Sequence, residues 1–163
     1  MTFDKLYQLT TESSSNLVTL NQYTEFDEVL PLNTLRVYRS DSTPDKNKYY
    51  SGAHAGTKQQ ALIRADYMVN DEERYEQYYL YELTLSFNNI YPELVSDDGS
   101  NHSSNYVDEF KDYDILFYKN TGEGDIRNEN LSVIIVNPDI VIESKVIDEL
   151  NSSYLLSIQD ELY

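Results

Sequence analysis

The stretch Tyr78-Tyr-Leu-Tyr-Glu-Leu-Thr-Leu-Ser-Phe87 carries the strongest β-strand signal in the chain. Its apolar side chains recur at every second position: Tyr79, Tyr81, Leu83, Leu85 and Phe87. Because successive side chains of a strand point to opposite faces, this spacing puts one apolar face toward a core. A sheet with this segment as a strand is therefore the starting expectation for the fold.

Further strands are expected on both sides of that segment. Leu35 to Tyr38 alternates as a strand does, and it is followed by turn residues at Ser42-Thr-Pro-Asp45. Asp114 to Tyr118 and Leu131 to Val136 are two apolar runs that predict buried strands joined through 121–130. Ile140 to Ile142, after Pro138, is expected to extend the sheet.

Three segments are predicted to be helical. The first, within residues 3–30, has apolar residues at spacings of three and four and ends before Pro31. The second runs from Thr57 to about Asn70, with Thr57 as a candidate N-cap and Gln60 three residues later. The third runs from Ser144 to the C-terminus. Between Val95 and Tyr106 the chain is rich in Ser, Asp, Asn and Gly, which predicts a mobile surface loop.

Composition narrows the function classes. A chain of 163 residues with 40% hydrophobic residues fits one folded domain. The absence of cysteine excludes disulfides, thiolate nucleophiles and cysteine-ligated zinc, and two histidines make a histidine-rich metal site unexpected. Neither a leader segment nor a membrane-length apolar window is found, so a cytoplasmic protein without membrane contact is the default expectation.

The charge is strongly acidic and spread along the chain. Twelve Lys and Arg against 29 Asp and Glu give a formal net charge of −17, and no basic patch is visible, so direct binding of nucleic acid is not expected. The simplest interpretation of this acidic charge is that it keeps the protein soluble. A more specific interpretation is that the protein mimics DNA, with carboxylates that imitate phosphates and so block the DNA-binding site of another protein.

Four polar positions are candidates for chemistry, each with a simpler alternative. Arg39 follows a strand and could hold a phosphate through paired hydrogen bonds, or it could pair with a nearby carboxylate. His54 lies between Gly52 and Gly56, which let a ligand approach the backbone closely, although it could equally bond a neighbouring carbonyl. Thr57 opens a helix whose free amides could attract an anion. Glu123, between two glycines, could stabilise positive charge at an anomeric carbon, or it could simply be solvated.

Taken together, these motifs resemble the ADP-ribosyltransferase family, especially small phage- and toxin-associated, anti-CRISPR-like members. Val37-Tyr38-Arg39 is similar to the family's first strand, which ends in an Arg or His that meets NAD. Gly52-Ala-His54-Ala-Gly56-Thr57, continued by Ala61 and Arg64, resembles a pattern of some phage members. Asp114-Ile-Leu-Phe-Tyr118-Lys-Asn120-Thr-Gly-Glu123, followed by Leu131 to Ile140, looks like the acidic loop and closing strand.

The resemblance implies a fold and a domain organisation. It implies an α+β domain over 34–163 with a split, mostly antiparallel sheet flanked by helices, preceded by a helical extension over 1–33. It covers about Leu35 to Ser144 and therefore leaves the extension without a family assignment.

The resemblance also implies an activity and a set of site residues. NAD would be the substrate, with no metal. Glu123 and Arg39 would be catalytic, and cofactor binding would involve Arg39, Ser40, Ser51, Gly52, His54, Gly56, Thr57 and Asn120. Asp125 is the alternative to Glu123 if the loop register differs. Position 121 is Thr where arginine-modifying members have an acidic residue, so arginine is a less expected acceptor.

Three function classes follow from these observations. The first is transfer of ADP-ribose from NAD to a host macromolecule, as a phage or mobile-element effector or counter-defence factor. Its expected target is a basic host protein, such as a nucleic-acid-binding enzyme or a defence complex, toward which the acidic surface would steer it. The second is the non-catalytic acidic DNA mimic. The third is a degenerate transferase fold retained only for binding.

Overall fold

A computed structural model describes residues 34–44, 50–95, 103–120 and 130–163 of the chain. The helix expected within residues 3–30, and with it the helical extension over 1–33, lies outside these residues. No helix of the described residues is both long and apolar enough to cross a membrane.

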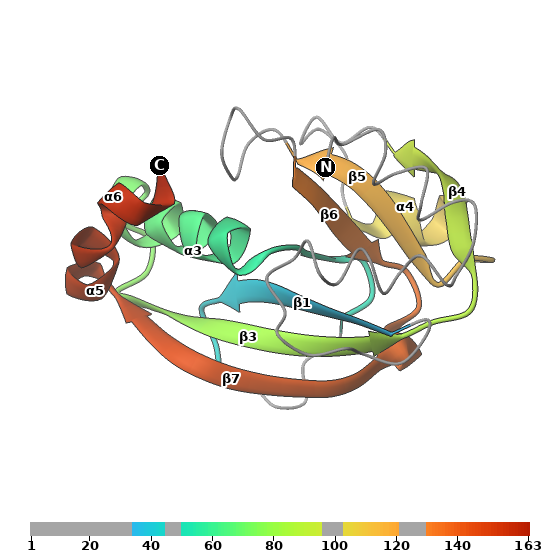
Figure 1. Cartoon of the computed structure of the whole chain (residues 1–163), viewed down its shortest axis with the longest axis horizontal. Coiled ribbons are helices and arrows are strands. Elements are labelled where there is room, and N and C mark those ends of the chain that lie inside the picture. Colours follow the sequence, from blue (N-terminus) through green and yellow to red (C-terminus); the bar gives the residue numbers. More distant parts are fainter. Residues whose placement is uncertain (1–33, 45–49, 96–102, 121–129) are drawn as a thin grey trace.

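The first sheet has three strands and is antiparallel throughout (Figure 1). Its order is β1 (Thr34–Asp41), β3 (Gln77–Ser86) and β7 (Val141–Asn151). The alternating segment that predicted a sheet is thus the central strand, and the strand expected at Leu35 to Tyr38 is its neighbour. Both predictions are confirmed.

The second sheet has four strands and is mixed. Its order is β2 (Ala53–Ala55), β6 (Asn130–Ile135), β5 (Ile115–Asn120) and β4 (Ile90–Val95). β4 runs parallel to β5, whereas the other pairs are antiparallel. The strands expected at Asp114 to Tyr118 and Leu131 to Val136 are therefore confirmed, and they pair with each other. The protein is an α+β fold with one antiparallel and one mixed sheet.

Few helices flank the two sheets. They are α3 (Lys58–Asp66), continued by a π-helical turn over Tyr67–Asp71, α4 (Ser103–Glu109), a 3-10 turn over Pro138–Ile140, α5 (Ser152–Ser157) and α6 (Gln159–Leu162). Thr57 is the N-cap of α3. Its side chain accepts from the Gln60 amide at 3.1 Å, and the Gln60 side chain accepts from the Thr57 amide at 2.9 Å. The predicted capping box is confirmed.

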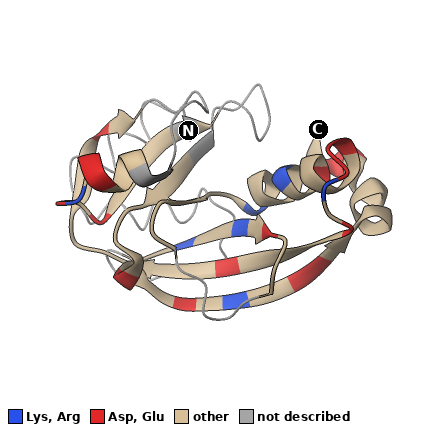
Figure 2. Cartoon of the chain, turned by 180° about the vertical axis from the view of Figure 1, so that it is seen from behind, with Lys and Arg blue, Asp and Glu red and all other residues tan. Residues whose placement is uncertain are grey.

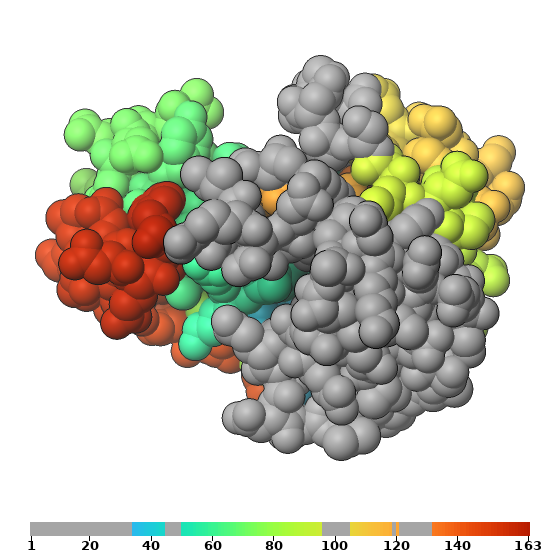
Figure 3. All heavy atoms as spheres, turned by 45° about the horizontal axis from the view of Figure 1, so that its top comes forward, coloured from blue at the N-terminus to red at the C-terminus, as the bar shows by residue number. Residues whose placement is uncertain are grey.

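β3 is buried on both faces. Tyr81, Leu83 and Leu85 pack into the core between the two sheets. The alternate residues Tyr78 and Leu80 pack with α3 and α5 instead. Figure 3 shows the C-terminal helices, in red, beside the green segment that contains α3. One strand thus serves two cores, which explains why its sequence is almost continuously apolar or aromatic.

The helix predicted from Ser144 to the C-terminus is wrong over its first part. Residues up to Asn151 belong to β7, and helix begins only at Ser152. The pairing of β7 with β3 shifts register twice, so that Ile142 and Ile147 have no partner in β3. Each shift adds one residue to the strand and breaks its period of two. The apolar residues consequently fall at spacings that imitate a helix.

Two further differences concern the segment between β3 and β5 in the sequence. β4 was not predicted, because Pro92 interrupts its sequence and the strand lies at a sheet edge. The surface loop expected from Val95 to Tyr106 is wrong at its end, since α4 already begins at Ser103. Residues 96–102 lie outside the described residues.

Candidate functional site

The two sheets meet where β1 passes the end of β2. The Tyr38 amide donates to the Gly56 carbonyl at 2.8 Å, and the Gly56 amide donates to the Tyr38 carbonyl at 2.9 Å. This isolated antiparallel bridge places Arg39, the next residue of β1, beside His54 of β2. We call Arg39, Asp41, His54 and Tyr118 the strand junction.

Arg39 is held from two sides in the strand junction. Its Nη1 donates to the His54 carbonyl at 3.2 Å, and its Nη2 lies 3.0 Å from Asp41 Oδ2. The two side chains are 19% and 20% exposed, so this ion pair is well shielded from water. The buried Nε atom of Arg39 has no hydrogen-bond partner among the described residues. The Nε–H of Arg39 is therefore a donor that no described residue accepts.

His54 sits among aromatic side chains. Its Nδ1 and the Tyr118 hydroxyl oxygen are 3.1 Å apart, which is hydrogen-bonding distance. The rings of Tyr118 and Tyr106 lie edge-on to the imidazole, with centroid separations of 5.4 and 6.2 Å. The hydrogen bond to Tyr118 links β2 to β5, two strands that do not pair directly.

A buried polar chain runs from α3 into the second sheet. Gln60 Oε1 accepts from the Thr57 amide and, at 2.8 Å, from the Ser132 hydroxyl. Asn120 Nδ2 donates to Ser132 Oγ at 3.1 Å. Gln60 and Ser132 are each only 2% exposed. The chain thus joins Thr57 to Asn120, the last described residue before 121–129.

Gly56 leaves the space that the side chain of Gln60 occupies. A Cβ atom at this position would lie 1.8 Å from Gln60 Oε1 and 2.9 Å from Ser132 Oγ. Real Cβ atoms do not approach other atoms so closely, so a side chain at this position would displace Gln60 from its hydrogen bonds with Thr57 and Ser132.

Three of the expected cofactor-binding residues are not gathered at the strand junction. Ser40 follows Arg39 in a regular strand and so faces the opposite side of the first sheet. Ser51 Oγ donates to the Val136 carbonyl at 3.3 Å, and the Gly52 amide donates to the Ile135 carbonyl at 2.6 Å. These bonds hold a turn at the end of β6, where Gly52 has a φ of 76°.

The two carboxylates proposed for catalysis lie outside the described residues. Glu123 and its alternative Asp125 both fall within 121–129. The structure therefore describes Arg39, His54, Gly56, Thr57 and Asn120 as candidate residues of the junction and its polar chain, without the acidic group.

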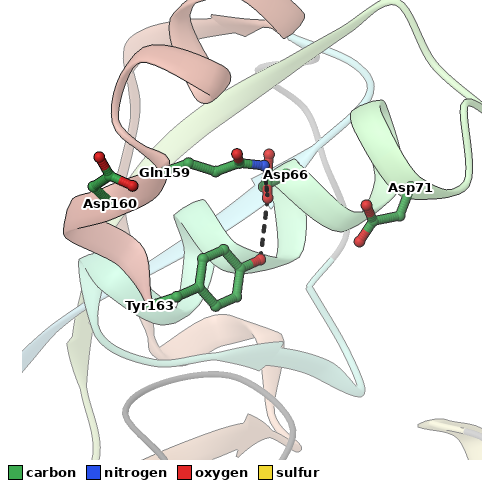
Figure 4. Close-up of a pocket in the computed structure, with 5 residues that line it drawn as sticks. All are labelled: Asp66, Asp71, Gln159, Asp160 and Tyr163. Carbon is green, nitrogen blue, oxygen red and sulfur yellow. Dashed lines mark hydrogen bonds between the residues drawn. The ribbon is translucent and has the colours of Figure 1, made fainter.

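A second polar cluster lies at the far end of α3. A pocket of about 420 Å³ is lined by Asp66, Asp71, Gln159, Asp160 and Tyr163 (Figure 4). The carboxylate of Asp66, a residue only 1% exposed, accepts from Asn70 Nδ2 at 2.6 Å, Tyr163 Oη at 3.1 Å and Gln159 Nε2 at 3.4 Å. Burial, together with the hydrogen bond to Asp66 and its charge, raises the pKa of Tyr163 to about 12. We call Asp66, Asn70, Gln159 and Tyr163 the aspartate cluster.

Within the described ranges no group of three or more His, Asp or Glu side chains is placed to hold a metal ion. In the aspartate cluster the carboxylate of Asp66 is occupied by three side-chain hydrogen bonds.

Sequence reasoning missed part of the junction. The ion pair between Arg39 and Asp41 could not be predicted from the sequence, where only their spacing of two along a strand connects them. Ser132 is the one hydroxyl in an apolar strand, which marks it as a candidate buried hydrogen-bonding group. The aromatic side chains of Tyr81, Phe117 and Tyr118 are buried in the cores of the two sheets.

Comparison with known proteins identified no relative of this chain. The chain matches no protein-family model, no curated protein and no solved structure. The assignment of function must therefore come from the residues of this chain.

Proposed function

We propose that this protein transfers ADP-ribose from NAD to a host macromolecule, most simply a protein, with the strand junction as part of its NAD-binding site. The observation that supports the proposal is the approach of Arg39 to His54, with Arg39 Nη1 3.2 Å from the His54 carbonyl. Two polar residues 15 positions apart are thereby held side by side at the meeting point of two sheets. This is where the resemblance to ADP-ribosyltransferases requires a cationic residue on the first strand.

Arg39 suits an anionic ligand. Its guanidinium is always charged, and its Nε remains without a partner among the described residues. Asp41 competes for the same cation at 3.0 Å, so a phosphate would share or replace this ion pair. Arg39 is already largely removed from water by its pairing with Asp41. Replacing that carboxylate by a phosphate therefore costs less desolvation free energy than burying an unpaired arginine would.

The other residues would orient the substrate. The bond to Tyr118 fixes the imidazole of His54, which would contact the nicotinamide or adenosine side of NAD. The hydrogen bonds from Gln60 to Ser132 and from Ser132 to Asn120 fix the side chain of Asn120. Asn120 directly precedes residues 121–129, which contain Glu123. Glu123 would accept a hydrogen bond from a hydroxyl of the nicotinamide ribose and stabilise the positive charge that develops at its C1′ atom.

The reaction balances without a metal. The bond from C1′ to the nicotinamide nitrogen breaks, and its electron pair leaves with nicotinamide. A nucleophilic atom of the acceptor forms the new bond to C1′ and loses its proton. Hydrogen bonds that strengthen as charge develops at C1′ would accelerate this step.

Nicotinamide release from NAD tests the proposal directly. Wild-type protein, Glu123→Ala and the matched control Glu129→Ala, from the same segment, would be compared in a bacterial lysate with labelled NAD. We expect label on a discrete protein with wild type and with Glu129→Ala, and a loss of at least about a hundredfold with Glu123→Ala, as for removal of one transition-state contact. Equal activity of Glu123→Ala and wild type would show that Glu123 is not a catalytic residue.

The formal charge of −17 supports a second candidate, the acidic DNA mimic. A mimic needs surface carboxylates and has no use for a shielded Arg39 beside His54. Its signature would be tight, salt-sensitive binding to a DNA-handling protein with no nicotinamide release from NAD.

A further inference from the structure

The edges of the two sheets are not equally protected. β1 is bridged to Gly56 and packs along α3. β2 has only three residues, and β4 contains Pro92, which has no amide hydrogen to offer a partner. Short length, proline and coverage are the usual ways in which proteins keep an edge from pairing with another chain.

β7 is the exception among the described strands. It is the outer strand of the first sheet, spans eleven residues and contains neither proline nor glycine. Residues 142–149 are all exposed. They include three aliphatic side chains with large exposed fractions: Ile142 at 62%, Val146 at 38% and Ile147 at 37%. An edge of this length with exposed aliphatic residues can accept a further strand.

The charged side chains of β7 favour a basic strand as its binding partner. Glu143, Asp148 and Glu149 are exposed, and Lys145 already pairs with Glu82 at 3.1 Å. Figure 2 shows the lysine of this strand flanked on both sides by acidic residues. A second copy would bring the same carboxylates together on a protein of net charge −17, whereas a cationic strand would meet complementary charge.

We propose that β7 binds an extended, basic segment of another protein, which adds to the first sheet as a further strand. Backbone hydrogen bonds to the outer edge of β7, with which no described strand pairs, would provide much of the affinity. Apolar side chains of the segment would cover Val146 on one face of the sheet. Its Lys or Arg side chains would pair with Glu143 and Asp148, whose β3 partners Thr84 and Leu80 lie on the other face. This inference does not depend on the proposed transferase activity.

The test is binding of a short, fluorescently labelled peptide of alternating lysine and valine, measured by anisotropy with the full chain. Two double variants would be compared. Glu143→Lys with Asp148→Lys changes two acidic residues on one face of β7, and Glu109→Lys with Glu161→Lys changes two exposed acidic residues elsewhere by the same charge. We expect the β7 variant to weaken binding at least about tenfold more than the control variant, because close like charges oppose docking.

A second peptide separates strand addition from charge attraction alone. N-methylation of alternate residues blocks backbone hydrogen bonding but leaves the lysines unchanged, so we expect binding to fall. Hydrogen exchange of the β7 amides should slow when the unmodified peptide binds. Equal weakening by both double variants, or undiminished binding of the methylated peptide, would overturn the proposal. So would a concentration-dependent dimer that protects β7 without peptide, because the occupant would then be a second copy.

Discussion

The strand junction and the aspartate cluster each shield a charged side chain from water, but the charge is used differently in the two. In the aspartate cluster, the carboxylate of Asp66 receives hydrogen bonds from three side chains. In the strand junction, Arg39 bonds Asp41 and the His54 carbonyl, and its Nε has no partner within the described residues. Buried polar groups are normally satisfied, so the remaining donor marks the junction, not the cluster, as the candidate binding site.

The largest effect on stability is expected for Gly56→Ala. The added Cβ would displace Gln60 Oε1 and break the hydrogen bonds that Gln60 accepts from Thr57 and Ser132. We expect the free energy of unfolding to fall by about 2–4 kcal/mol, as for overpacking combined with lost buried hydrogen bonds. Chemical denaturation of Gly56→Ala, Gln60→Ala and the double variant would measure this loss. If the effects of the two single changes add fully, the clash with Gln60 is not the cause.

Asp66→Ala should have an intermediate effect. The change leaves Asn70, Gln159 and Tyr163 without their shared acceptor, and we expect a loss of about 1–3 kcal/mol in the free energy of unfolding. Nicotinamide release from NAD should be unchanged at a temperature where the variant is folded. Asp71→Ala, an exposed change at the same pocket, is the control and should alter stability by less than about 0.5 kcal/mol. A selective loss of nicotinamide release in Asp66→Ala would show that the aspartate cluster is part of the active site.

The smallest effect is expected for Tyr163→Phe, and its signature is a change in how stability depends on pH. The pKa of Tyr163 is raised from 10.0 to about 12, so the folded protein keeps a proton that the unfolded chain releases in this range. The stabilisation is fully present below pH 10 and is lost as the pH rises toward 12. Tyr163 is 71% exposed, which keeps the contribution small.

Denaturation midpoints between pH 9 and 12 would test this expectation. The midpoint of Tyr163→Phe should decline less steeply with pH than that of the wild type. Tyr75→Phe, at another exposed tyrosine, should follow the wild type. Identical slopes for all three proteins would contradict the assigned role of the hydrogen bond to Asp66.

The sequence predicted those elements whose signal is local. The period of two in β3 and the capping box at Thr57 depend on residues a few positions apart, and both are confirmed. β7 was mistaken for helix because the register shifts at Ile142 and Ile147 are set by its pairing with β3, a long-range property. The approach of Arg39 to His54 could be expected only through a family resemblance. The pairing of Arg39 with Asp41 and the path from Gln60 through Ser132 to Asn120 needed the structure.

NAD binding at the strand junction is the central claim, and calorimetric titration of NAD into purified protein tests it most directly. Arg39→Lys should weaken binding by about tenfold or more, because lysine cannot reproduce the planar, multidentate contacts of arginine. Arg36→Lys is the matched control, since Arg36 lies on the other face of the same strand and pairs with Glu82. We predict that the wild type and Arg36→Lys bind NAD alike and that Arg39→Lys binds weakly. No binding by the wild type, or equal binding by all three proteins, would contradict the account.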